Sequence, residues 1–150
     1  MELLLPCLYA GLGCLAFCVV FELHSWKYML SASVTGAAGW LVYLLLDAHG
    51  SVTRFFLATI VVAVMSEIFA RIHKAPATVF LIIGIIPLVP GGGIYYTMEA
   101  LINGDMPLFV QRGLETAASA GAMAVGCSLV SSAARILTIW RRGHHLQKTA

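Results

Sequence analysis

Two prolines and three glycines interrupt the most apolar stretch of this chain. Residues 77–102 contain a single charged side chain, yet the middle of this run reads PLVPGGG, from Pro87 to Gly93. Each proline removes a backbone donor and clashes with the preceding helical turn, while glycine lets the backbone leave helical geometry without a steric cost. The sequence therefore predicts a helix that breaks between Pro87 and Gly93.

The composition places this broken helix in a membrane. Hydrophobic residues make up 60% of the 150 residues, charged residues only 11%, and the mean hydropathy is +0.90. An average soluble domain has about 25% charged residues. In hydrocarbon, an interrupted backbone is tolerated only where protein or a water-filled cavity satisfies it. Because the run is centred near Val89 and Pro90, the break is predicted near the bilayer midplane, where broken helices of secondary transporters form substrate sites.

Polar interruptions divide the chain into five apolar segments. We therefore expect an all-α integral membrane protein, a bundle of about five transmembrane helices that forms a single domain over residues 1–150. The expected spans cover about residues 3–21, 29–46, 54–70, 77–102 and 114–140, and the fourth is the broken helix.

The positive charges predict how this bundle is oriented. Five spans place most Lys and Arg on one side, which identifies that side as cytoplasmic. We therefore expect an external N-terminus, a cytoplasmic C-terminus and a fourth segment that crosses, because a hairpin at the glycines would move the C-terminal charges outside. The cytoplasmic set is Lys27, Arg71, Lys74, Arg135, Arg141, Arg142 and Lys148, and the external set is Arg54 and Arg112.

The glycines are the first candidate site. They open the second half of the broken helix, so their free N–H groups and the positive end of the helix dipole are suited to bind a carboxylate. A hinge or a close helix crossing is the alternative. The predicted substrate-binding residues are Pro90, Gly91, Gly92, Gly93, Tyr95 and Tyr96.

Ionisable residues inside the predicted spans are candidates for proton coupling. Glu67 lies within the third span, and an acid at such depth is a functional candidate by default. Arg71 follows it at i+4, so a structural ion pair is the alternative. Glu99 lies three and four residues after the two tyrosines, near the external end, where a solvated acid is equally expected.

Other site chemistries receive little support from the residues. No nucleophile, base and orienting group can be placed together, so no enzyme is expected. The basic residues are too few and too dispersed for nucleic acid. No cofactor or metal is predicted, because Cys14 and Cys18, which share a helical face, lack acidic or histidine neighbours. The histidines are expected in loops or in the tail: His24, His49, His73, His144 and His145.

Small residues in the fifth span predict close helix packing. They recur at intervals of four on two neighbouring faces, which lets backbones approach each other. Packing within the chain and packing against a partner both remain open. One face holds Gly113, Ala117 and Gly121, and the other holds Ala118, Ala122 and Gly126.

The segment PLVPGGGIYYTM, from Pro87 to Met98, together with Glu67 in the preceding span, resembles the second membrane half of the threonine/serine exporter family. The likeness covers nearly the whole chain. In that family the two halves are fused or are separate subunits, so a chain of this length resembles the small subunit, a half-transporter.

This resemblance implies proton-driven efflux of small carboxylate-bearing metabolites, either threonine and serine or a dicarboxylate such as succinate, across a bacterial inner membrane. It also implies a larger membrane subunit that carries the first half. A second carboxylate would need a cation, and Arg71 is the basic residue expected near the interior end of a span. A membrane assembly or regulatory subunit without a transport path is the alternative function.

Overall fold

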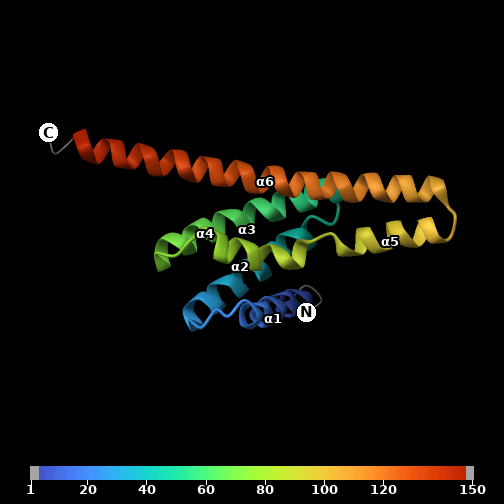
Figure 1. Ribbon diagram of the computed structural model, residues 1–150, viewed down its shortest axis with the longest axis horizontal. Coiled ribbons are helices and arrows are strands. Elements are labelled where there is room, and N and C mark those ends of the chain that lie inside the picture. Colours follow the sequence, from blue (N-terminus) through green and yellow to red (C-terminus); the bar gives the residue numbers. More distant parts are fainter. Residues whose placement is uncertain (1–3, 148–150) are drawn as a thin grey trace.

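The computed structural model describes residues 4–147, and this part of the chain consists of helices joined by short loops (Figure 1). Leu3, the predicted start of the first span, and Lys148 lie outside the described residues. The elements are α1 (Leu4–Val20), α2 (Trp26–Leu45), α3 (Ser51–His73), α4 (Ala77–Ile85), the short 3₁₀ helix η1 (Ile86–Leu88), α5 (Gly91–Ile102) and α6 (Met106–Gln147).

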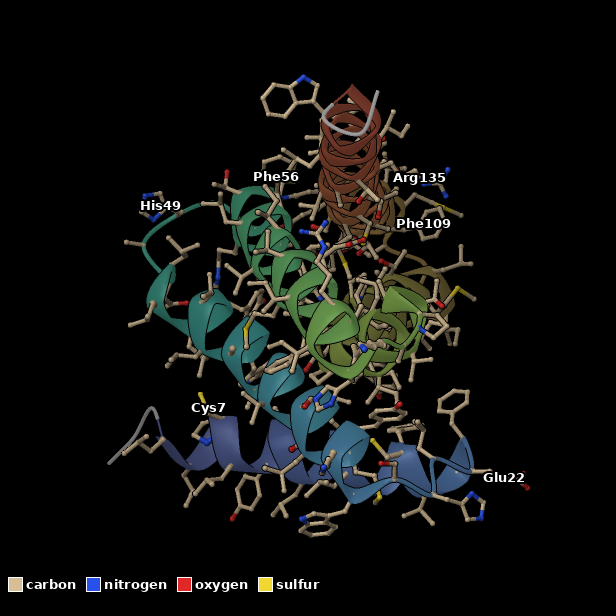
Figure 2. The ribbon with its side chains drawn as sticks, turned by 90° about the vertical axis from the view of Figure 1, so that its left-hand side faces the viewer. Cys7, Glu22, His49, Phe56, Phe109 and Arg135 are labelled. Carbon is tan, nitrogen blue, oxygen red and sulfur yellow. The ribbon has the colours of Figure 1, made fainter. Side chains whose placement is uncertain are left out.

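The expected all-α membrane bundle is confirmed. Within the described residues, α2, α3 and the part of α6 from Met106 to Trp140 are long and apolar enough to cross a membrane. The bent pair formed by Ala77–Leu88 and Gly91–Ile102 supplies a fourth span if it is taken as one. Helix α1 has 17 residues, at the lower end of the range of about 17–25 for a span. It also lies across the direction of α6, which Figure 2 views nearly end-on.

The last helix differs from its predicted bounds. It begins at Met106 rather than near residue 114, so Arg112, expected in an external loop, is helical. Gly104 makes the preceding turn with a φ of +76°. The carboxylate of Asp105 then accepts the N–H of Leu108 at 3.1 Å, which satisfies one of the free donors of the first turn. The polar residues before residue 114 were expected to form a loop. In the structure, Asp105 caps α6 and the polar residues that follow it belong to the helix.

The break in the fourth segment lies at Val89 and Pro90. The segment bends by 43° and continues in the same general direction (Figure 1), so the chain does not turn back at the glycines. Val89 has φ −56° and ψ 126°, whereas Gly91 already begins α5. Proline cannot donate a backbone hydrogen bond, so the carbonyl of Ile83, four residues before Pro87, instead accepts the N–H of Ile86 and the thiol of Cys14.

Two buried clusters hold the helices together. The cluster toward α1 joins four helices through Cys14, Cys18, Ala32, Ala70, Phe80 and Ile83, and the cluster toward α6 contains Phe55, Ala58, Val62, Leu88 and Met123. Between them α2 approaches its neighbours closely, since a side chain on Gly39 would collide with Val62 and one on Gly84 would collide with Thr35. These clusters fix α2, α3 and α4 as a compact unit.

Helix α5 is less enclosed than the other helices. In the described part of the chain its contacts are with α6 alone, and the α5–α6 hairpin extends past the ends of α2 and α3 (Figure 1). Its apolar side chains are correspondingly exposed, with Ile94 at 55% and Ile102 at 82%. The outer surface of α5 therefore lacks a protein neighbour among the described residues.

Candidate functional site

An open cavity of about 520 Å³ lies beside the break. The last turns of α2, the first turns of α3 and α5, the break itself and one face of α6 enclose it. It is lined by Trp40, Tyr43, Ser51, Phe55, Pro87, Leu88, Val89, Pro90, Gly92, Gly93, Tyr96, Arg112, Glu115, Thr116 and Ser119.

The position of this cavity differs from the predicted depth of the break, which was the middle of the spans. The break is halfway along the α4–α5 segment, as the sequence indicated. Tyr43 near the end of α2 and Ser51 at the start of α3 line the same cavity, however. The break is therefore level with the end of α2 and the start of α3, and α5 and the first turns of α6 extend beyond that level.

Four of the six predicted substrate residues line this cavity, and two do not. The lining residues are Pro90, Gly92, Gly93 and Tyr96. Gly91 and Tyr95 are absent from the lining, and the Tyr95 side chain is 66% exposed. The structure thus brings the second and third glycines to the cavity and leaves the first outside it.

The start of α5 presents free backbone donors at the cavity. Gly91 donates its N–H to Val89 at 2.7 Å, and Ile94 donates to Pro90 at 3.2 Å. In the described part of the chain, the N–H groups of Gly92 and Gly93 reach no carbonyl that precedes the helix. The N-terminal N–H groups of a helix have no intrahelical acceptor, so these two are available to a ligand.

The two cavity glycines have different surroundings. A Cβ atom on Gly93 would lie 2.5 Å from the hydroxyl of Thr116, so this glycine permits the close crossing of α5 and α6. A Cβ atom on Gly92 would meet only Tyr96, at 3.9 Å, and one on Gly91 would meet nothing within 4 Å. Close packing, one of the alternatives raised by the sequence, therefore explains Gly93 and leaves Gly92 without a packing role.

Two charged residues of α6 complete the cavity, and the sequence analysis did not select either. Arg112 and Glu115 line it together with Thr116 and Ser119, at the i, i+3, i+4 and i+7 spacing of one helical face. The guanidinium carbon of Arg112 lies 5.2 Å from the centre of the Tyr96 ring, a contact that orients the cation. The spacing was visible in the sequence, but the predicted helix began after Arg112.

The cavity lining also contains polar groups of α2, α3 and α6. The hydroxyls of Ser51 and Ser119 lie 3.3 Å apart, which joins α3 to α6. The indole nitrogen of Trp40 is buried and has no hydrogen-bond partner among the described residues. A buried donor without an acceptor is costly, so Trp40 is a lining residue with an unsatisfied polar group. Neither group was among the predicted site residues.

The predicted coupling residues lie elsewhere. Glu67 and Arg71 form an ion pair of 3.7 Å, and Glu67 lines a separate hollow of about 260 Å³ with Arg135 of α6. Glu67 is about 18 Å along α3 from Phe55 at 1.5 Å per residue. Glu99 and Arg71 do not line the main cavity either, so its cation is Arg112.

His73 is also placed differently from the expectation. It belongs to the last turn of α3 rather than to a loop. Its Nε2 atom lies 2.8 Å from the Ser31 hydroxyl, and its ring packs against Tyr28, Phe69 and Phe80. The left-handed residue that ends the helix is the following Lys74, with a φ of 53°. This histidine therefore helps to pack α2, α3 and α4 together.

Of the comparisons with known proteins, the scan of family models finds a match. The family model described as "Threonine/Serine exporter, ThrE" matches residues 6–133. The matched range contains the break, the whole cavity lining and Glu67. No curated protein and no solved structure matches the chain.

Proposed function

The chain belongs to the threonine/serine exporter family, a family of membrane transporters rather than enzymes, and on this premise we propose that it is one membrane subunit of a proton-coupled exporter of small carboxylate-bearing metabolites. The substrates are threonine and serine or a dicarboxylate such as succinate. The subunit works in a bacterial inner membrane with an external N-terminus, a cytoplasmic C-terminus and a larger subunit that carries the first half of the exporter.

The observation that carries this proposal is the cavity beside the break. Its volume of about 520 Å³ lies within the range of about 300–1,000 Å³ for small-molecule sites. Gly92 and Gly93, whose N–H groups are free, line the same cavity as Arg112. A helix N-terminus and an arginine both favour a carboxylate, which is the group that all the proposed substrates share.

The uncovered surfaces of α5 and α6 support a partner subunit. Helix α5 contacts only α6 within the described chain, and Gly121 of α6 has nothing within 4 Å of an added Cβ. A shallow hollow of about 300 Å³ continues from there along Ala124, Val125 and Ser128. Small residues on an open face allow another membrane helix to approach closely. We place the larger subunit on this face.

A vesicle assay tests both the transport and the partnership. We expect efflux of labelled threonine or succinate from vesicles that contain both subunits, and none from vesicles with this chain alone. Gly121→Leu is expected to prevent formation of the complex, because it adds bulk where helices meet. Co-purification with the larger subunit measures this loss.

Gly126→Leu is the matched comparison. Gly126 faces inward, and an added Cβ would lie 3.3 Å from the Phe56 carbonyl oxygen, so this change is expected to lower the yield of the folded chain itself. Equal complex yields for Gly121→Leu and the unaltered chain would contradict the proposed interface. Efflux by the larger subunit without this chain would favour an assembly or regulatory role.

Glu67 remains the proposed proton-coupling residue, with Arg71 as its charge partner and Glu99 as a second candidate. Glu67 is about a quarter exposed and lies between α3 and α6. Its only partner among the described residues is Arg71, at 3.7 Å, which leaves the carboxylate loosely held. Protonation of Glu67 would break this pair within α3 and remove a negative charge from the hollow that α3 shares with α6.

We expect Glu67→Gln to abolish the dependence of efflux on the proton gradient, because glutamine keeps the size and polarity but does not titrate. Efflux is measured with and without an imposed gradient. Arg71→Gln is the companion variant, expected to reduce the dependence without removing it. Unchanged gradient-driven efflux in Glu67→Gln would reduce the residue to a structural ion pair.

A further inference from the structure

We propose that Glu115 binds the ammonium group of the substrate and thereby selects amino acids over dicarboxylates. This inference rests on the proposed function, because it assigns a second contact within the same cavity. Glu115 follows Arg112 by one helical turn, and both side chains line the cavity. One cation and one anion thus face the same space from the same helix.

Neither charge is neutralised within the described chain. No ion pair within 4.0 Å joins Arg112 to Glu115, and neither residue forms an ion pair with another described residue. The Arg112 guanidinium instead lies over the Tyr96 ring. Glu115 has no hydrogen-bond partner among the described residues. Both groups are therefore free to pair with a ligand that carries opposite charges.

Arg54, a further charged residue near the cavity, does not add to the charge of the cavity wall. Arg54 of α3 packs on the Tyr43 ring, but it pairs with Asp47 at 2.8 Å and does not line the cavity. Tyr43 and Tyr96 are the titratable residues that α2 and α5 contribute to the lining. The cavity wall therefore carries one positive and one negative charge.

This balance matches a zwitterion. A carboxylate bound by Arg112 and the α5 terminus places the ammonium of an α-amino acid on the side of Glu115. A dicarboxylate would bring a second negative charge to that acid, and like charges at such a site are unfavourable. The Ser51 and Ser119 hydroxyls share one hydrogen bond, which leaves one hydroxyl proton available to a hydroxyl-bearing substrate.

Binding of threonine and of analogues that lack one charged group tests the assignment. The probes are L-threonine, 3-hydroxybutyrate, which lacks the ammonium, and succinate, each measured in the two-subunit complex. We expect the unaltered complex to bind threonine about ten- to a hundredfold more tightly than 3-hydroxybutyrate, the range typical of one charge-assisted hydrogen bond. In Glu115→Gln this preference should disappear through weaker threonine binding, whereas 3-hydroxybutyrate should bind as before and succinate more tightly.

Two controls keep the result specific. Glu115→Asp retains the charge and should restore part of the preference, and Glu22→Gln removes a carboxylate beyond the end of α1 and should leave the preference unchanged. Equal affinity for threonine and 3-hydroxybutyrate in the unaltered complex would overturn the assignment, as would a full preference in Glu115→Gln. Failure of the proposed function is distinguishable, because then none of the three probes would bind.

Discussion

Arg112→Gln is expected to abolish measurable efflux, because it removes the only cation that lines the cavity within the described chain. Glutamine is shorter than arginine, but it is polar and a good helix former, so the helix should still form. Losing a charge-assisted hydrogen bond costs about 1.5–3 kcal/mol, which corresponds to a loss of affinity of roughly ten- to a hundredfold. Equilibrium binding of threonine and succinate to the two-subunit complex measures this loss.

Two comparisons separate a substrate contact from a general effect of charge. Arg112→Lys keeps the charge but not the planar fork of donors, so we expect intermediate affinity. Lys27→Gln removes a cation from the exposed start of α2 and should leave binding unaltered. Loss of affinity for threonine without any loss for threoninamide, which lacks the carboxylate, would identify the group that Arg112 reads. Equal losses for acid and amide would contradict a carboxylate contact.

The sequence predicted the helical membrane architecture and the break because both depend on local properties. Proline removes backbone donors wherever it stands, so the interruption at Pro87 and Pro90 follows from the sequence alone. The deviation itself lies at Val89 and Pro90, and the glycines are helical. Glycine permits unusual geometry without requiring it, and here Gly93 serves the approach of another helix instead.

The composition of the cavity depended on tertiary structure and was only partly predictable. In the sequence, Arg112 was placed in a polar loop and Glu115 at the start of the next helix, because the predicted span began near residue 114. The cap at Asp105 extends the helix toward them. Trp40 and Ser51 reach the cavity from α2 and α3, and no spacing in the sequence relates these residues to the break.

The same limit explains the position of Glu67. Its depth within a span was visible in the sequence, but its distance from the glycines was not. Helix α3 runs antiparallel to the α4–α5 segment (Figure 1), so Phe55 near its start reaches the break while Glu67 lies near its other end. A coupling role for Glu67 would therefore act through the contact between α3 and α6 rather than on the substrate directly.

Alanine substitution of the three consecutive glycines is expected to give three different results. Gly91→Ala should bind and transport normally, because its Cβ would meet nothing within 4 Å and Gly91 does not line the cavity. Gly92→Ala should fold normally and bind about tenfold more weakly, since its methyl group would obstruct the free N–H groups that a carboxylate approaches. Gly93→Ala should destabilise the chain by about 1–3 kcal/mol, the usual cost of overpacking.

Gly93→Ala has a specific rescue that identifies its mechanism. The added methyl group would collide with the Thr116 side chain, because the Oγ1 and Cγ2 atoms of Thr116 would lie only 2.5 and 3.1 Å from the new Cβ atom. Thr116→Ala removes both atoms, so the double variant should recover most of the lost stability, as measured by thermal unfolding in detergent. The same second substitution should not restore binding in Gly92→Ala, because that glycine does not contact Thr116.

The comparison of Gly91→Ala with Gly92→Ala decides between a binding site and a hinge. Both changes restrict the backbone equally at adjacent positions of the first turn of α5, but only Gly92 lines the cavity. A hinge predicts slower turnover with near-normal affinity in both variants, whereas a carboxylate site predicts weaker binding in Gly92→Ala alone. Alanine changes both backbone flexibility and ligand access at Gly92, but it changes flexibility alone at Gly91. Equal behaviour of the two variants would therefore exclude the α5 terminus as the carboxylate site.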